Sequence, residues 1–371
     1  IRVMVQWKAK YVQLSGSLLE LGFTTAYINE KLLYINPEAN LNALTRTQVV
    51  RNTFISHYSI RGFDITGNLN YDYEQASVAA CQQIKKRNLG GVQINARYVF
   101  NNNIAICLGL RQDILNKQAS PFSPSLSIGY VKKINVKHSI YLSLQGARAF
   151  RFATFNDLYW VPGGNPDLKT EKSWKGELSF LYNYNSIVNF SATGFCNYVD
   201  DWIQWIPQGT IWSAVNYKRV LSRGFEAAIN ATNTNLPREK FKVDFRVSYS
   251  FTRTTGLDGL SAYDQSKGKQ LIYVPLHNVA AGLQLQYYRF YIRSTNNYVS
   301  TIYTSTDNSQ ALKGFFISNL EVGKDFVFGP HEVGASFRIN NVGNADYQSV
   351  AQRPMPGRAY EGILRFKFAS K

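Results

Sequence analysis

The chain has 371 residues, of which 45% are hydrophobic, 14% aromatic and 18% charged, and its formal net charge is +17. This apolar content excludes an intrinsically disordered chain, and three cysteines in this length exclude a small disulfide-stabilised scaffold. A mean hydropathy of -0.24 and the lack of any run of about 18 apolar residues exclude a helical membrane protein.

Apolar and polar residues alternate along most of the chain. In 241–252 every second residue is Phe, Val or Tyr, and the residues between them are Lys, Asp, Arg, Ser or Thr. The same pattern fills 63–74 and 173–184. A β-strand sends successive side chains to opposite faces, so each segment has one apolar and one polar face.

The alternating segments are longer than the strands of soluble proteins, which usually have about five or six residues. They run over roughly nine to thirteen residues, the length that a tilted strand needs to cross a bilayer. We predict about 17 such strands. In chain order they lie near 2–13, 17–27, 50–59, 62–74, 91–100, 103–111, 122–131, 137–148, 173–184, 186–200, 210–231, 240–254, 274–287, 289–300, 312–325, 331–342 and 359–369.

The connections between these strands alternate between short and long. Short ones are predicted near 14–16, 101–103, 132–136, 185, 288–289 and 328–330. Long ones are predicted near 28–49, 75–90, 112–121, 149–172, 201–209, 255–273, 301–311 and 343–358. This regularity predicts an all-β fold, a transmembrane antiparallel up-and-down β-barrel with short periplasmic turns and long extracellular loops. A Greek-key sandwich gives no reason for it.

The basic balance does not favour nucleic acid as a partner. Lys and Arg are dispersed among turns, loops and polar faces rather than gathered in a basic helix or an RNA-binding sheet. We therefore expect no nucleic-acid partner, and we expect the excess charge to meet outer-membrane lipid, in particular lipopolysaccharide phosphates, or an anionic ligand. Tyr and Trp near the strand ends fit interfacial aromatic girdles.

No group of residues predicts catalysis or a metal centre. The four histidines do not accompany carboxylates in a pattern that supports hydrolysis, and no phosphate-binding loop stands between a strand and a helix. Asp200 and Asp201 would need several more oxygen ligands to hold calcium. We expect a protein that is not an enzyme and has no cofactor and no metal.

One segment resembles a known family. Residues 149–178 read AFRFATFNDLYWVPGGNPDLKTEKSWKGEL, which resembles the FRxPTFNDLYW and GNPxLKPE signature of TonB-dependent outer-membrane receptors. Four further resemblances follow in the family's order: 222–226 (SRGFE), 274–277 (VPLH), 340–347 (NNVGNADY) and 354–358 (PMPGR). Ala153 and Thr170 stand where the family often has Pro. The resemblance covers most of the chain from about residue 120 onward.

The resemblance implies a particular domain organisation. Barrels of this family have about 22 strands and hold an N-terminal plug. Counted back from the C-terminus, residues 1–371 would form the C-terminal part of such a barrel, which accounts for the odd strand number. The plug, the TonB box and the first strands would be absent. The chain also begins at Ile1, with no signal peptide, so we expect that its front has been removed or that it is a fragment.

The resemblance further implies active uptake of a scarce nutrient across the outer membrane of a Gram-negative bacterium. The ligand would be a ferric siderophore or cobalamin. A haem or glycan importer and a passive porin are the alternatives, and the lack of His between Phe150 and Leu168 disfavours haem. The expected partners are the TonB–ExbB–ExbD complex, acting through the plug, and a surface lipoprotein.

Two groups of residues are candidates for ligand contact. The first lies in the signature loop and consists of Arg151, Asn156, Tyr159 and Trp160. The second is the group Trp202, Trp205 and Trp212, which the pattern puts around the loop near 201–212 and which could stack on a flat or sugar-like ligand. A loop that only turns the chain, or an aromatic girdle at the membrane interface, explains the same residues.

Overall fold

The computed structural model describes residues 2–12, 17–36, 41–77, 84–233, 240–259 and 264–368. The chain divides into two compact units. Unit 1 contains Ile1–Tyr130, Ser143–Glu177 and Asn197–Val220, and unit 2 contains Val131–Leu142, Leu178–Cys196 and Leu221–Lys371. Strands β8 to β12 contribute residues to both units.

Nearly all of the regular structure is β-strand. The long strands are β1 (Arg2–Val12), β2 (Leu18–Asn36), β3 (Leu41–Ile60), β4 (Phe63–Ser77), β5 (Ile84–Phe100), β6 (Ile104–Leu115), β8 (Ser123–Lys133), β9 (His138–Arg151), β10 (Glu171–Tyr184), β11 (Val188–Gln208), β12 (Ile211–Thr232), β13 (Phe241–Gly256), β14 (His277–Tyr287), β15 (Phe290–Val299), β18 (Phe315–Phe328), β19 (His331–Asn340) and β22 (Ala359–Lys367). The short elements are β7 (Gln118–Ala119), β16 (Ile302–Tyr303), β17 (Ala311–Leu312), β20 (Gln348–Val350), β21 (Arg353–Pro354) and the helix α1 (Phe155–Tyr159).

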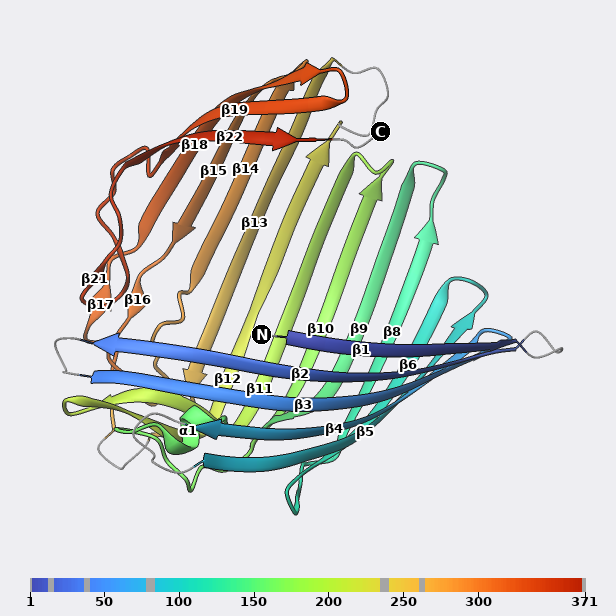
Figure 1. Ribbon diagram of the computed structural model, residues 1–371, viewed down its shortest axis with the longest axis vertical. Coiled ribbons are helices and arrows are strands. Elements are labelled where there is room, and N and C mark those ends of the chain that lie inside the picture. Colours follow the sequence, from blue (N-terminus) through green and yellow to red (C-terminus); the bar gives the residue numbers. More distant parts are fainter. Residues whose placement is uncertain are drawn as a thin grey trace. The chain divides into compact units, whose positions relative to one another are not determined.

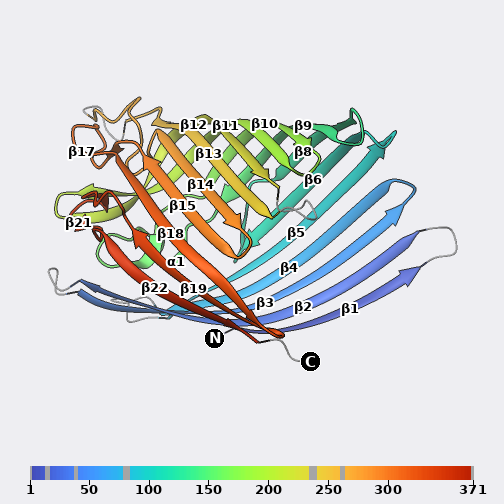
Figure 2. The same cartoon turned by 90° about the horizontal axis from the view of Figure 1, so that it is seen from above.

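Strands that follow one another along the chain are paired in antiparallel fashion. In unit 1, β1 to β6 form consecutive pairs and β6 then pairs with β8. Figure 2 shows β1 to β4 running side by side. In unit 2 the order is β13, β14, β15, β18, β19 and β22, and Figure 1 shows β13 to β15 and β18 as neighbouring ribbons. The up-and-down prediction is therefore confirmed.

The number of strands agrees with the alternation. Among the described residues, 18 strands belong to one hydrogen-bonded sheet, of which β7 has only two residues. The remaining strands of this sheet match the predicted segments. A strand with one apolar and one polar face produces the alternation from which they were predicted. The predicted turn at 14–16 lies outside the described residues.

Three of the predicted long loops are largely strand instead. In the predicted loop 75–90, β4 continues to Ser77 and β5 begins at Ile84. The segment 28–49 was expected to be irregular, but β2 and β3 continue through most of it, with a register from Ile28 opposite Val49 to Asn36 opposite Leu41. Similarly, β11 and β12 extend to a turn at 209–210, so 201–208 is strand. In each hairpin the two extended segments satisfy each other's backbone hydrogen-bonding groups, which a solvated loop would leave to water.

Large apolar side chains are exposed and many carboxylates are buried, the reverse of a soluble protein. Leu69, Val92 and Leu108, on β4, β5 and β6, have exposed fractions of 52%, 46% and 54%, whereas Asp72 and Asp113 have 3% and 1%. The buried carboxylates are paired: Arg51 contacts Asp72 at 2.7 Å, and Arg111 contacts Asp113 at 2.6 Å. One face of the sheet thus suits a hydrocarbon environment and the other holds ion pairs.

Tight turns close the short connections. Asn101, Asn102 and Asn185 have positive φ angles of 45°, 58° and 48°, a conformation that asparagine tolerates better than most residues. No helix in the described part of the chain is long and apolar enough to cross a membrane.

Candidate functional site

The loop between β9 and β10 contains the helix α1, which a capping box holds in place. The Thr154 hydroxyl accepts a hydrogen bond from the Asp157 backbone N–H at 3.1 Å, and the Asp157 carboxylate accepts one from the Thr154 N–H at 2.9 Å. Thr and Asp at these positions satisfy N–H groups that the first helical turn leaves without partners. The sequence TFND therefore begins the helix at a fixed point.

Asp157 also connects this helix to two other strands. Its Oδ1 accepts a hydrogen bond from Trp205 Nε1 of β11 at 3.0 Å, and its Oδ2 lies 3.4 Å from Arg151 Nη1 at the end of β9. Its carbonyl oxygen accepts from the Asn165 N–H at 2.8 Å. The residue is only 7% exposed. A buried carboxylate with this many donors is a structural centre of the loop.

The Arg151 guanidinium belongs to the same network. It makes a bidentate ion pair with Glu171, with Nε–Oε2 at 2.6 Å and Nη2–Oε1 at 2.8 Å, and Nη2 also donates to the Ile203 carbonyl at 3.2 Å. Glu171 in turn accepts from the Ile203 N–H at 2.6 Å. This geometry fixes β9, β10 and β11 relative to one another.

A glycine lets the loop approach β12 closely. Gly163 has a φ of +109°, and a Cβ built on it would lie 1.9 Å from the Trp212 carbonyl oxygen and 3.1 Å from the Trp205 ring. Its own carbonyl accepts a hydrogen bond from the Ala214 N–H at 2.7 Å. Only glycine fits this conformation and this contact.

The other side of α1 packs on β4 and β5. Phe155 is buried against Ala76, and Tyr159 and Trp160 pack beside them. The Arg87 guanidinium lies 4.4 Å from the Phe155 ring centroid, pairs with Glu74 and donates to the Ala153 carbonyl at 2.9 Å.

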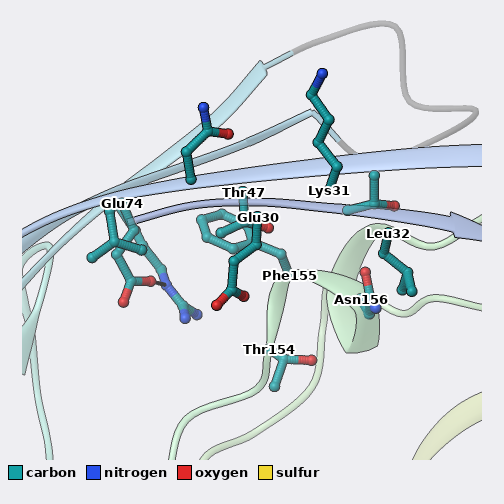
Figure 3. A pocket seen from close by; sticks show the side chains of 12 residues that line it. Glu30, Lys31, Leu32, Thr47, Glu74, Thr154, Phe155 and Asn156 are labelled. Carbon is teal, nitrogen blue, oxygen red and sulfur yellow. Dashed lines mark hydrogen bonds and ion pairs between the residues drawn. The ribbon is translucent and has the colours of Figure 1, made fainter. Parts of the chain in front are cut away.

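A cavity of about 760 Å³ lies beside this contact. Its lining comes from β2 and β3, from Glu74 and Arg87, and from Thr154, Phe155 and Asn156 of the signature loop. In Figure 3 the Glu30 and Glu74 side chains point toward the segment that carries Thr154 and Phe155, whereas Lys31 points away from it. The strand alternation accounts for the opposite directions of Glu30 and Lys31.

The structure brings most of the predicted site residues into one neighbourhood. Arg151 and Trp205 meet at Asp157, and the Trp212 backbone contacts Gly163. Tyr159 and Trp160 pack on the α1 contact, and Asn156 lines the cavity. Trp202 precedes Ile203 on β11, and its buried Nε1 has no hydrogen-bond partner in the described part of the chain. Trp202 and Trp205 lie on β11, so the expectation of a loop position was wrong for these two residues, whereas Trp212 lies on β12, within a predicted strand.

Sequence reasoning missed the residues that hold the site together. The sequence pattern gives Asp157 and Glu171 no role beyond the family signature, and it predicts a long loop over Glu30 and Thr47. Asp157 could have been noticed as the fourth residue of a capping box that begins with Thr154. Nothing in the sequence points to its contact with Trp205, because that residue is 48 positions away.

A second polar cluster lies in unit 2 on β15, β18, β19 and β22. Glu321, with a 4% exposed side chain, is 2.7 Å from Arg338, 3.4 Å from Arg293 and 3.6 Å from Arg365. Tyr291 donates its hydroxyl to Glu321 at 3.0 Å. Several arginines around one carboxylate leave local positive charge on this face.

The described residues contain no group of three or more His, Cys, Asp and Glu arranged to hold a metal ion. The carboxylates of both clusters are engaged by arginine, tryptophan or tyrosine donors. The Asp157 and Glu171 cluster positions strands and a loop within unit 1, and the Glu321 cluster joins β15, β18, β19 and β22 within unit 2.

A family model supports the resemblance found in the sequence. The model described as "TonB dependent receptor-like, beta-barrel" matches residues 9–342.

Two curated relatives align with the chain, and both are vitamin B12 transporters. The chain is 22% identical over 379 residues to a vitamin B12 transporter of Photobacterium profundum, an alignment that covers 97% of this chain and 59% of the relative. A vitamin B12 transporter of Vibrio vulnificus is 35% identical over 79 residues, which is 21% of this chain and 13% of the relative. The chain thus spans little more than half the length of the first relative.

Solved structures share the fold. The copper transporter OprC matches with a TM-score of 0.70 at 14% identity, covering 97% of this chain and 64% of that chain. The siderophore receptor PiuA of Acinetobacter baumannii matches with a TM-score of 0.69 at 13% identity, covering 98% and 64%. These similarities extend over almost all of the chain.

Proposed function

We propose, because the chain belongs to the family of TonB-dependent receptor-like β-barrels, that it forms part of a receptor that imports a scarce nutrient. As a member of this family it is a multi-pass β-strand protein of the cell outer membrane. The match of the family model over residues 9–342 carries the proposal. The exposed apolar face and the buried ion pairs of the sheet support it.

The nutrient we propose is a ferric siderophore or cobalamin. Support comes from the vitamin B12 transporter that aligns with 97% of the chain and from structural neighbours that are siderophore receptors. A haem or glycan importer is the weaker alternative, since no histidine lies between Phe150 and Leu168. Transport rather than catalysis is proposed, because the family consists of receptors and transporters.

We assign residues 1–371 to the C-terminal part of the barrel wall. The chain spans 59% of the aligned transporter's length, which leaves room for a plug and the first strands in the whole receptor. Energy would come from the TonB–ExbB–ExbD complex through that plug. Lipopolysaccharide would contact the outer surface, and a surface lipoprotein is a further possible partner.

The predicted site residues divide into three proposed roles. Asn156, Tyr159, Trp160 and Trp212 would contact the ligand, since they belong to the signature loop or to the strand end beside it. Arg151 and Trp205 would position that loop through Asp157. Trp202 would add apolar surface on β11.

Uptake measurements on the whole receptor test the proposal. We expect cells that depend on this receptor to accumulate labelled cyanocobalamin or a labelled ferric chelate, and to lose accumulation when TonB is deleted. A passive porin would give uptake that survives the deletion and rises linearly with concentration. That result, or uptake of neither probe, would contradict the proposed function.

A further inference from the structure

The cavity beside α1 has an uneven distribution of charge. Its charged lining residues are the carboxylates Glu30 and Glu74 and the cations Lys31 and Arg87. Arg87 is already engaged, because it pairs with Glu74, donates to the Ala153 carbonyl and lies over the Phe155 ring. Glu30 forms no ion pair or hydrogen bond with any residue that the structure describes, and it is exposed. Glu30 is therefore a carboxylate of the wall that no described residue compensates by an ion pair.

Lys31 also lines the cavity, but it forms no ion pair with Glu30. It follows Glu30 on β2, and the alternation of the strand turns it to the opposite face. Figure 3 shows its amine pointing away from the segment that carries Thr154 and Phe155. The residue opposite Glu30 on β3 is Thr47, which is uncharged.

The rest of the wall offers neutral hydrogen-bonding groups and apolar surface. Thr47 and Thr154 bring hydroxyls, Asn156 brings an amide, and Phe155 and Val49 bring apolar atoms. The Thr154 oxygen already accepts from the Asp157 N–H, so its hydroxyl hydrogen remains to be donated.

Thr45 adds a polar group that the described residues leave without a partner. Thr45 lines the cavity and is only 6% exposed, and its Oγ1 has no hydrogen-bond partner in the described part of the chain. A rotation about χ1 exchanges the hydroxyl with the methyl group. A rotamer that brings the hydroxyl within reach of a molecule in the cavity would satisfy it.

We propose that this cavity is the subsite for a part of the nutrient that is rich in hydrogen-bond donors and carries no negative charge, such as primary carboxamides. The inference rests on the proposed function and names the chemistry of its ligand. Glu30 accepts hydrogen bonds from ligand N–H groups. The Thr47 and Thr154 hydroxyls and the Asn156 amide form the other hydrogen bonds to the ligand. An anionic iron chelate would bring like charge to Glu30, which disfavours it.

Binding to the whole receptor in outer-membrane preparations tests the proposal, with cyanocobalamin as the carboxamide probe and ferric citrate as the anionic probe. We expect tighter binding of cyanocobalamin. Glu30→Gln should weaken it about fivefold, because a charge-assisted hydrogen bond becomes a neutral one. Glu30→Lys should weaken cyanocobalamin further and improve ferric citrate. Thr47→Val should weaken cyanocobalamin without changing charge.

Glu20→Gln is the matched control. Glu20 lies on the same strand, ten residues away and on the same face, and it does not line the cavity. It should leave both affinities unchanged. Immunoblotting of the outer membrane checks that each variant is inserted.

The outcomes separate the two proposals. If the receptor binds cyanocobalamin and both Glu30→Gln and Thr47→Val leave the affinity unchanged, the subsite is overturned and the nutrient receptor stands. Ferric citrate bound more tightly than cyanocobalamin has the same consequence. If neither probe binds and neither is taken up, both proposals fail.

Discussion

Asp157 shows how much of the signature loop depends on single side chains. Its carboxylate accepts from the Thr154 N–H, from Trp205 and from Arg151, which belong to the loop, to β11 and to β9. Each donor would remain buried or partly buried without it. Because unsatisfied buried donors cost free energy, the carboxylate stabilises the loop more than a surface ion pair could.

Asp157→Asn should therefore loosen the loop. The asparagine amide has one accepting oxygen where the carboxylate has two, so it cannot accept from all three donors. We expect a loss of about 2–3 kcal/mol of local stability. Limited proteolysis of the whole receptor within 152–170 measures it. Asp167→Asn, an exposed carboxylate of the same loop, serves as the control. Equal cleavage rates for the two variants would contradict the role given to Asp157.

Gly163→Ala should displace the loop from β12. The added Cβ would lie 1.9 Å from the Trp212 carbonyl oxygen at a φ of +109°, and strain together with overpacking should cost about 2–4 kcal/mol. The change in Trp fluorescence on denaturation reports it, since Trp205 and Trp212 border the glycine. Gly146→Ala, with no atom within 4 Å of its Cβ, should be nearly neutral. A fluorescence transition at the same denaturant concentration in both variants would argue against the close contact.

Strands were easier to predict than the ends of strands. Alternation gives the central part of each strand because the pleat has a period of two. The charged residues Glu30 and Lys31 interrupt the apolar pattern, so the alternation predicts a loop where β2 and β3 in fact continue. The register Glu30 opposite Thr47 shows that these residues keep the two-faced pattern. Pairing between strands decides their length, and a single segment does not contain that information.

The loops after β13 and β15 are joined by one asparagine. Asn308 has a φ of +63°, its Oδ1 accepts from the Gln270 N–H at 3.0 Å, and its Nδ2 donates to the Gln270 carbonyl at 2.9 Å. It thus pairs with Gln270 as a strand backbone would. Hydrogen bonds from Ser305 and Ser309 lower the pKa of the neighbouring Asp307 to about 2, so that carboxylate keeps its charge near neutral pH.

Replacing Asn308 should release these loops from each other. We expect Asn308→Gly, which tolerates the positive φ, to raise hydrogen exchange of the Gln270 amide about tenfold through the lost side-chain bonds. Asn308→Ala should raise it further, since a Cβ in this conformation costs about 1–2 kcal/mol more. Exchange measured by mass spectrometry over 264–274 distinguishes the variants. Unchanged protection in both would mean that other contacts hold the loops.

The two faces of the sheet explain what the composition conceals. The mean hydropathy of -0.24 averages an apolar face with a face of ion pairs. The sequence was enough to predict the fold and the family, because both depend on local patterns and short motifs. The centre of the candidate site could not be predicted, because Asp157, Glu171 and Trp205 meet only after three strands have paired.

A charge on the apolar face should therefore cost much more than the same charge on the polar face. Leu108 is 54% exposed on β6, opposite Ala96 and Leu126 of the neighbouring strands. Leu108→Arg should destabilise the whole receptor in lipid vesicles by about 2–4 kcal/mol, because hydrocarbon does not solvate a guanidinium. Gln93→Arg, on the other face of β5 beside Asn95, should cost less than about 1 kcal/mol. Unfolding in urea, followed by electrophoretic mobility, measures both. Similar costs for the two variants would mean that Leu108 does not face lipid, whereas the expected difference would identify the face of β6 that carries Leu108 as lipid-facing.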